Sequence, residues 1–269
     1  MDELPYVYNE NAKINYKISD IITTCLTGLE TFLNDIKNNI PDSLTAIIEN
    51  LIDQYRRNED FGILIDTNYE LLNRCPELIK GSINSILSIL NFTKYNQNSI
   101  NDEIAVEVID IIRTFNQFEY SFVTILLKIM SRKETIDYIK RLADDVVHSR
   151  KDLNRYVENF DEYLDRTQIN LKRWQAQEVA FKNLNNEKFL YKVKKCRWAE
   201  VMKELDRELS YYIICYTDFE NTKNLNPNFV LTRTKTKMMG DEYCDFCTHD
   251  TRKVKEISHP SEKEFLELN

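Results

Sequence analysis

A short stretch near the C-terminus concentrates residues that could do chemistry. Basic residues alternate at Arg233, Lys235 and Lys237, and Cys244 follows a Gly240-Asp241 pair. Cysteine attacks as the thiolate, and nearby positive charge stabilises the thiolate and lowers the pKa of the thiol. Arginine and lysine are also suited to holding a substrate carboxylate. These residue types indicate a cysteine nucleophile beside a site for an anionic group.

A β-hairpin would bring these residues together. The runs 229–238 and 243–248 are typical of strands, and Gly240-Asp241 predicts a two-residue turn between them. Lys237 would then oppose Cys244, and Lys235 would oppose Phe246, so that Arg233 and the thiol share a face with both lysines. The residues expected on the other face are Thr234, Thr236, Asp245 and Cys247. Spacing alone still favours the alternative, a solvated basic strand face with an inert, half-buried cysteine.

The spacing of Cys244, Cys247 and His249 also allows a metal-site interpretation. A structural zinc site usually takes four ligands in two pairs, and the sequence offers no second Cys-x-x-Cys or His pair. Strand geometry would also point Cys244 and Cys247 to opposite faces. We therefore expect no metal and no other cofactor. All six cysteines are expected to be free thiols, since nothing in the sequence indicates an oxidising compartment.

Charge and hydropathy limit the classes of function. The 269 residues include 36 basic and 44 acidic side chains, giving a net charge of −8, which argues against a general nucleic-acid binder. No apolar run approaches the roughly 20 residues that a membrane span needs. The acidic N-terminus lacks the order of a signal peptide. We expect a cytoplasmic protein that acts on a small molecule or peptide, without nucleic-acid or membrane partners, and a homodimer is an open option.

The first part of the chain is expected to be helical. Only four glycines and five prolines occur, which favours long helices. Apolar residues recur at three- and four-residue steps, and a longer, largely apolar run follows. The segments expected to form helices are 16–36, 44–55, 66–75, 79–90 and 104–129. The segment 133–183 is highly charged but still periodic, so helices are expected there too.

Beyond Asn183 the hydrophobic period changes. Strands are expected over 189–193 and 211–216, with a short helix over 199–205 between them. Together with the hairpin, these elements predict an α+β fold in which a helical N-terminal half precedes a small domain of helices packed on an antiparallel sheet. The expected domains are 1–132 and 133–257, followed by a charged tail over 258–269.

The C-terminal stretch resembles the signature of the L-2-amino-thiazoline-4-carboxylic acid hydrolase family. The signature reads Arg-Thr-Lys-Thr, a short spacer, Gly-Asp, two residues, then Cys-Asp-Phe, and it matches 233–236, Gly240-Asp241 and 244–246. Upstream, the family shows a cysteine ahead of a short helix, a strand ending in Cys-x-x-Asp, and an Asn-Pro pair. The matching residues here are Cys196, Cys215, Asp218 and Asn226-Pro227. Several matches in the right order make the resemblance specific.

The resemblance implies hydrolytic opening of a thiazoline ring or of a related cyclic amidine-like or thioamide-like C=N group. It implies roles for Cys244 as nucleophile or pocket wall, and for Asp241 or Asp218 as general base. Asp241 has a strong alternative as a simple turn residue. The residues that we expect to bind substrate are Arg233, Lys235, Thr234, Cys215 and Phe246.

Two other classes of function stay open beside the hydrolase. One is a non-catalytic small-molecule-binding or sensor domain whose helical half transmits a signal or mediates dimerisation. A closed pocket without a water-accessible base near Cys244 would favour it. The other is a helical adaptor, because long amphipathic runs suit partner helices as well as an internal bundle.

Overall fold

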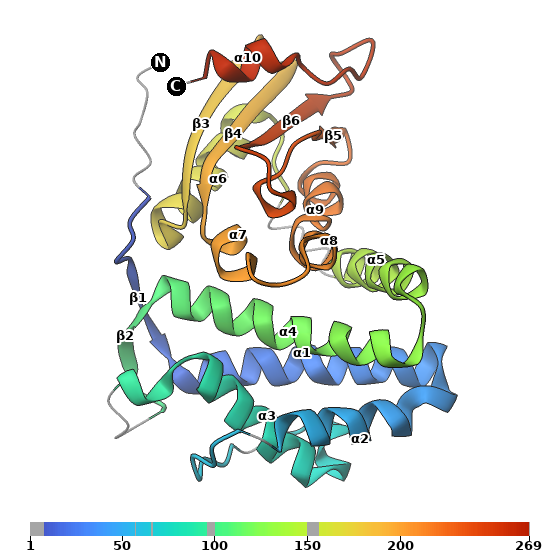
Figure 1. Cartoon of the computed structure of the whole chain (residues 1–269). Coiled ribbons are helices and arrows are strands. Elements are labelled where there is room, and N and C mark those ends of the chain that lie inside the picture. Colours follow the sequence, from blue (N-terminus) through green and yellow to red (C-terminus); the bar gives the residue numbers. More distant parts are fainter. Residues whose placement is uncertain (1–7, 57, 66, 96–99, 150–155, 269) are drawn as a thin grey trace. The chain divides into compact units, whose positions relative to one another are not determined.

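The computed structural model describes residues 8–56, 58–65, 67–95, 100–149 and 156–268 (Figure 1). The chain divides into two compact units, one formed by Lys13–Tyr138 and the other by Ile139–Asn269 with Met1–Ala12. Helices fill the first unit and a four-stranded antiparallel sheet organises the second, which confirms the predicted α+β class. None of the described helices combines the length and the apolar character needed to cross a membrane.

The first unit is built from amphipathic helices that bury their apolar faces against one another. Aromatic side chains join the helices, as where the rings of Phe32 and Phe122 stack with centroids 5.0 Å apart. The helices are α1 (Ile18–Asn39), α2 (Leu44–Tyr55), α3 (Pro76–Ile89) and α4 (Val108–Ile129). Short 3-10 helices occur at Pro41–Ser43, Leu72–Arg74 and Phe92–Lys94.

Two short strands in this unit were not predicted. β1 (Lys13–Lys17) pairs antiparallel with β2 (Glu103–Glu107), so that Ile14 lies opposite Val106. The sequence predicts that the helix begins at 104, but α4 begins only at Val108. Two segments about 90 positions apart must meet for either strand to form, and local periodicity does not report such a distant partner.

The second unit follows α5 (Arg132–Ser149), which leads into it from the first. Its sheet has the order β3-β4-β6-β5, and each neighbouring pair is antiparallel. The strands are β3 (Gln177–Leu184), β4 (Lys188–Cys196), β5 (Phe229–Thr232) and β6 (Cys244–Asp250). The helices are α6 (Phe160–Trp174), α7 (Arg197–Met202), α8 (Arg207–Ser210), the π-helix η5 (Tyr211–Cys215), α9 (Asp218–Leu225), the 3-10 helix η6 (Lys237–Met239) and α10 (Glu262–Leu266).

The two faces of this sheet have different covers. Successive residues of a strand point to opposite faces. On β6, Cys244 and Phe246 therefore lie on one face, which packs with Leu171 of α6 and is called the helix face below. Cys247 lies on the other face, which packs with Phe265 of α10 and is called the tail face below. Part of the expected tail is thus packed on the sheet.

Two elements of this unit differ from the prediction. The run 211–216, predicted as a buried strand, is helical, because the Asp206 carboxylate caps α8 by accepting from the Leu209 N–H at 3.1 Å and the helix continues through η5. The run 177–184, predicted as helix, is β3. Gln175 ends α6 with a left-handed φ of 48°, so the break needs neither glycine nor proline.

The predicted two-residue hairpin turn is wrong. β5 ends at Thr232, which pairs with Cys247. In this register the position opposite Phe246 belongs to Arg233 and not to Lys235. The chain leaves the sheet there because the Asp245 carboxylate captures the backbone N–H groups of the loop that follows. The register differs from the predicted one by two residues. Arg233 and Phe246 consequently still share the helix face, since the side-chain period of a strand is two.

Candidate active site

Two adjoining hollows on the helix face form one cavity. Their volumes are about 270 Å³ and about 330 Å³. Four side chains, those of Gln177, Trp198, Asp218 and Phe246, line both hollows and so mark where they join. All the described lining residues belong to the second unit, from α6, the sheet, and the connections between β4 and β6. A cavity of this size suits a small ligand or one side chain of a peptide.

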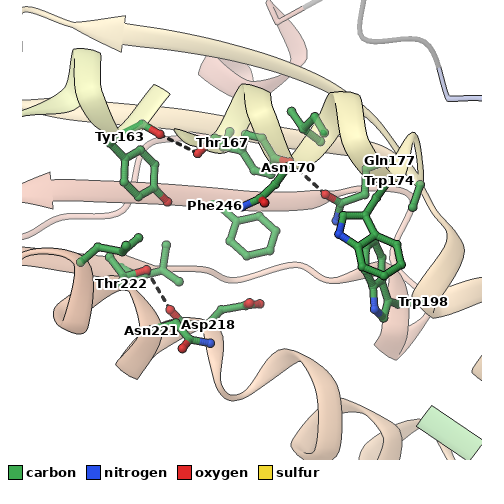
Figure 2. A pocket seen from close by; sticks show the side chains of 15 residues that line it. Tyr163, Thr167, Asn170, Trp174, Gln177, Trp198, Asp218, Asn221, Thr222 and Phe246 are labelled. Atoms are coloured by element: carbon green, nitrogen blue, oxygen red, sulfur yellow. Dashed lines mark hydrogen bonds between the residues drawn. The ribbon is translucent and has the colours of Figure 1, made fainter. Parts of the chain in front are cut away.

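Aromatic rings and neutral amides dominate the first hollow. Figure 2 shows Trp174, Trp198 and Phe246 among the side chains that line it. Gln177 is held in place because the Tyr191 hydroxyl donates to its Oε1 at 3.0 Å. The lining amides besides Gln177 are Asn170 and Asn221. The first hollow therefore offers flat apolar surfaces together with hydrogen-bonding groups that carry no charge.

Asp218, at the start of α9, supplies the carboxylate of the cavity. Its Oδ2 accepts a hydrogen bond from Nη1 of Arg233 at 2.7 Å. The Asp218 side chain is 39% exposed whereas that of Arg233 is 2% exposed, so the cavity meets the carboxylate and not the guanidinium. Burial raises the pKa of Asp218, and the nearby Arg233 charge opposes that rise. A carboxylate with a raised pKa is a suitable proton acceptor and donor near neutral pH.

Arg233 lies beneath this carboxylate as a buried support. Its Nη2 donates to the Cys215 carbonyl at 2.9 Å and to the Tyr211 hydroxyl at 3.2 Å. The guanidinium carbon also lies 4.8 Å from the ring centre of Phe246 and 5.0 Å from that of Phe219. These contacts occupy both terminal nitrogens and the ring-stacking faces. The structure thus joins Arg233 to the site, but in contact with Asp218 instead of exposed to a ligand.

Three thiols line the second hollow, those of Cys196, Cys215 and Cys244. Cys244 Sγ accepts from the Lys237 backbone N–H at 3.2 Å and lies 3.7 Å from the Thr236 hydroxyl. Thr236 also lies 4.0 Å from Cys215 Sγ. Two of the cysteines that the sequence singled out are therefore brought to one wall, with Asp218 lining the same hollow.

The thiol pKa values do not follow the sequence prediction. Burial raises the pKa of Cys244, and the hydrogen bond from Lys237 N–H only partly opposes this effect. Burial also raises the pKa of Cys196 to about 12 and that of Cys215 well above its usual value. The expected net lowering is wrong because burial outweighs the charge of Arg233, which does lower the pKa of Cys244, and because both lysine ammonium groups are engaged elsewhere, Lys235 with Glu262 and Lys237 with the Glu242 carbonyl. A thiol here needs a base to take its proton before it can attack.

Other predicted site residues lie outside the lining of both hollows. Lys235 forms an ion pair with Glu262, and its ammonium lies 5.1 Å from the Tyr243 ring centre, on the side of α10. Thr234 donates its N–H to Asp245 at 2.8 Å. Asp241 is exposed and accepts from the Thr236 N–H at 2.7 Å, as a turn residue does.

The tail face carries a polar network that lies behind this site. Asp245 accepts from the backbone N–H groups of Thr234 and Lys235, and from His259 Nε2 at 3.0 Å. Thr232 Oγ1 lies 2.8 Å from His259 Nδ1 and 2.9 Å from His249 Nε2. The network fixes the loop that delivers Arg233 and the Thr236 hydroxyl to the opposite face.

The Thr232 hydroxyl links both imidazoles of this network. His259 Nε2 donates to the Asp245 carboxylate at 3.0 Å. The Thr232 hydroxyl lies within hydrogen-bonding distance of His259 Nδ1, of His249 Nε2 and, at 3.3 Å, of the Cys247 carbonyl. The remaining atom, His249 Nδ1, is buried without a hydrogen-bond partner among the described residues.

A metal bound by Cys244, Cys247 and His249 does not fit this geometry. Cys244 faces the cavity, whereas Cys247 packs with α10 on the tail face and His249 is directed to the same network as Thr232. Among the described residues, no three His, Cys, Asp or Glu side chains are grouped so as to hold a metal ion.

Several lining residues were not expected to contribute to a site. Trp174, Trp198, Gln177 and Asn170 all line the first hollow, although none of them belongs to the motifs that the sequence singled out. They come from α6, β3 and α7, which converge only in three dimensions. The one available signal was the pair of tryptophans flanking the predicted strand 189–193, since exposed aromatic residues often line binding sites.

The comparison with protein families covers the part of the chain that forms the cavity. Residues 115–248 match the family model of L-2-amino-thiazoline-4-carboxylic acid hydrolase. The matched segment begins within α4 and ends within β6, so it includes every lining residue of the cavity. No curated protein matches the chain.

Proposed function

Because this chain belongs, through residues 115–248, to the L-2-amino-thiazoline-4-carboxylic acid hydrolase family, we propose that the helix-face cavity is a hydrolase active site. The proposed reaction opens a C–N bond in a cyclic amidine-, thiazoline- or thioamide-like small molecule or modified peptide. The observation that carries the proposal is the partly exposed Asp218 carboxylate, supported from behind by buried Arg233, in a cavity that also contains the Cys244 thiol.

In the proposed mechanism the Cys244 sulfur adds to the carbon of the C=N group. Asp218 takes the thiol proton, because burial keeps Cys244 protonated until a base acts and raises the proton affinity of Asp218 as well. The ring nitrogen, already protonated in the cationic substrate, receives that proton and leaves as an amine; the C–N electron pair stays on the nitrogen, and a lone pair of the remaining heteroatom forms a double bond to the carbon that carries Cys244. Water then adds to this carbon while Asp218 takes one of its protons. The bond to Cys244 breaks as the carbonyl forms, Asp218 returns its proton to the thiolate, and the hydroxyl proton passes to the product amine, so that the net reaction adds one water.

The proposal assigns supporting roles to the neighbouring groups. Arg233 holds Asp218 in place through the 2.7 Å contact and is a positioning residue. The Lys237 N–H, which now donates to Cys244 Sγ, stabilises negative charge as it develops on the sulfur. Phe246 and Trp198 provide flat surfaces against which a planar ring can lie.

The test is turnover of a thiazoline panel by the full chain, followed by mass spectrometry for a product heavier by one water. Asp218→Asn should lower kcat/KM by about 10²- to 10⁴-fold, as expected for loss of a general base. Cys244→Ala should lower it comparably, whereas Cys215→Ala, a thiol change in the same hollow, should have a much smaller effect. Asp241→Asn is the matched acidic control outside the cavity.

The outcomes separate the alternatives. If Cys244→Ala retains the rate and Asp218→Asn loses it, water attacks directly and Cys244 is part of the wall. If all variants retain the wild-type rate, the cavity is not the active site. The raised thiol pKa values favour a second candidate, non-catalytic binding of a small molecule, in which a ligand of the panel binds without turnover.

A further inference from the structure

The charge of the cavity bears on which substrate the proposed site takes. No lysine or arginine is among the described residues that line either hollow. The two cations expected to hold a substrate carboxylate are engaged elsewhere, Arg233 beneath Asp218 and Lys235 with Glu262. A carboxylate buried without a cationic partner or comparable donors is strongly disfavoured. The cavity therefore lacks the feature that an anionic amino-thiazoline carboxylate would require.

The same lining offers what a flat cation requires. Asp218 is the lining carboxylate of both hollows, and its side chain is 39% exposed. The rings of Trp174, Trp198 and Phe246 surround the space beside it (Figure 2). Aromatic faces attract cations through the negative charge of their π-systems, and tryptophan does so most strongly. The amide oxygens nearby can accept N–H groups.

The positive charge of Arg233 does not cancel this preference at the cavity surface. Its side chain is 2% exposed and lies behind Asp218, against the rings of Phe246, Phe219 and Tyr211. A ligand in the cavity therefore meets the carboxylate directly and the guanidinium only through these groups. The unshared Asp218 oxygen, Oδ1, is the acceptor left for a ligand N–H group.

We propose that the cavity recognises a planar cationic amidine without a carboxylate group, of which protonated 2-amino-2-thiazoline is the simplest example. Its two N–H groups would face Asp218, and its ring would lie against the tryptophans. The inference names the ligand of the site proposed above, so it is tested by binding, which can succeed or fail independently of turnover.

The pH dependence of binding follows from the same contact. Burial raises the pKa of Asp218, and a bound cation favours the ionised carboxyl group. Binding should be strongest above the pKa of Asp218 and weaken as pH falls through it. It should also weaken at high pH as the amidine itself loses its proton. Burial raises the pKa of the Cys244 thiol, so it stays neutral over the lower part of this range.

The experiment is calorimetric titration of the full chain with three probes at neutral pH. These are 2-amino-2-thiazoline, its 4-carboxylate, and 2-methyl-2-thiazoline, a neutral ring of similar size. The amino compound should bind at least about tenfold more tightly than either of the others. Quenching of tryptophan fluorescence provides a second readout, since Trp174 and Trp198 line the cavity.

Two variants test whether Asp218 causes the preference for the cationic probe. Asp218→Asn should remove the advantage of the cation over the neutral ring, whereas Asp241→Asn should leave it intact. If Asp218→Asn does not fold, Trp198→Leu tests the aromatic part separately and should weaken the amino compound about fivefold or more. Thermal unfolding of each variant is recorded first.

Tighter binding of the carboxylate probe, or equal binding of the cation and the neutral ring, would overturn the inference. Cation binding without turnover would support the inference and count against the hydrolase proposal. If the protein instead prefers the carboxylate probe and turns it over, the hydrolase proposal is supported and the proposed preference for a cation is overturned.

Discussion

The helix face and the tail face of the same sheet carry equally polar groups but use them differently. On the helix face, Asp218 has one oxygen bound to Arg233 and is 39% exposed to a cavity. On the tail face, Asp245 is 3% exposed and accepts from two backbone N–H groups, a hydroxyl and an imidazole. The first carboxylate retains capacity for a ligand, and the second has none left.

This difference shows how one strand can serve both chemistry and stability. Neighbouring residues of β6 alternate between the faces, so Cys244 and Phe246 line the cavity while Asp245 and Cys247 are packed beneath α10. The saturated network on the tail face holds the loop that carries Arg233 and Thr236 to the helix face. Pre-organisation of a site by a rigid backing is a general requirement of binding and catalysis.

The largest loss of stability is expected on substitution of Arg233, which is held by the loop fixed on the tail face and which supports Asp218 on the helix face. Arg233→Met removes the partner of Asp218 and the donor to the Cys215 carbonyl, and the arginine side chain that makes both contacts is 2% exposed. The free energy of unfolding should fall by about 3 kcal/mol, the cost of breaking a buried ion pair. Urea unfolding measures it, and Lys237→Met on the same loop is the control, expected within about 0.5 kcal/mol of wild type. Equal stability of both variants would contradict the buried support role.

The tail face should give the protein a stability that depends on pH. Burial lowers the pKa of His249 to about 4, with the charges of Lys188 and His259 adding to the effect. The unfolded chain binds the proton near pH 6.5 and the folded chain does not, so the contribution of His249 is complete above that pH. It should be lost as pH falls from about 6.5 to about 4, by about 3 kcal/mol at most.

Urea unfolding of wild type and His249→Gln across that pH window checks this expectation. The variant should lose the part of the slope that His249 supplies, whatever its stability at pH 7. Parallel curves for the two proteins would show that His249 titrates normally in the folded chain.

Thr232 should show how far the tail-face network depends on a single hydroxyl. Thr232→Val keeps the shape of the side chain but leaves His249 Nε2 and His259 Nδ1 without their shared partner. We expect a loss of about 2 kcal/mol, the cost of unsatisfied buried polar groups. Denaturant unfolding measures the loss, and Thr251→Val is a matched control with an exposed hydroxyl bound to the Asn228 carbonyl. A loss no greater than that of the control would count against the network.

The smallest effect is a difference in thiol reactivity between the two faces. Burial raises the pKa of Cys244, and raises that of Cys247 to about 12, so iodoacetamide should modify both slowly at neutral pH. Cys244 should still react faster, because it lines the cavity whereas Cys247 is 0% exposed. Peptide mapping with Cys244→Ser and Cys247→Ser identifies the modified thiol. Faster modification of Cys247 would reverse the assignment of faces.

Much of the fold could be predicted because it depends on local periodicity. Apolar spacing identified α1 to α4, and the alternation around Cys244 correctly separated it from Cys247. The π-helix over 211–215 escaped prediction because a short aromatic and β-branched run is compatible with a buried strand or a buried helix. The capping carboxylate of Asp206 decides between them.

The candidate site was less predictable because its geometry depends on contacts between distant segments. The register was missed by two residues since Asp245 draws the loop out of the sheet, which sequence spacing does not reveal. Despite this error, Arg233 lies on the predicted face of the sheet. Lys235 does not, because its ammonium group pairs with Glu262. Trp174, Trp198 and Gln177 come from three elements whose meeting point is set by the tertiary fold.

A paired measurement on the two carboxylates tests the central claim, that the helix face performs the reaction and the tail face supports it. Both kcat/KM and the free energy of unfolding are measured for Asp218→Asn and Asp245→Asn. Asp218→Asn should lose activity by about 10²-fold or more while its stability changes less than that of the other variant. Asp245→Asn should lose about 2 to 3 kcal/mol of stability and keep most of its turnover where it is folded. The reverse pattern, with Asp218→Asn active and folded Asp245→Asn inactive, would contradict the account.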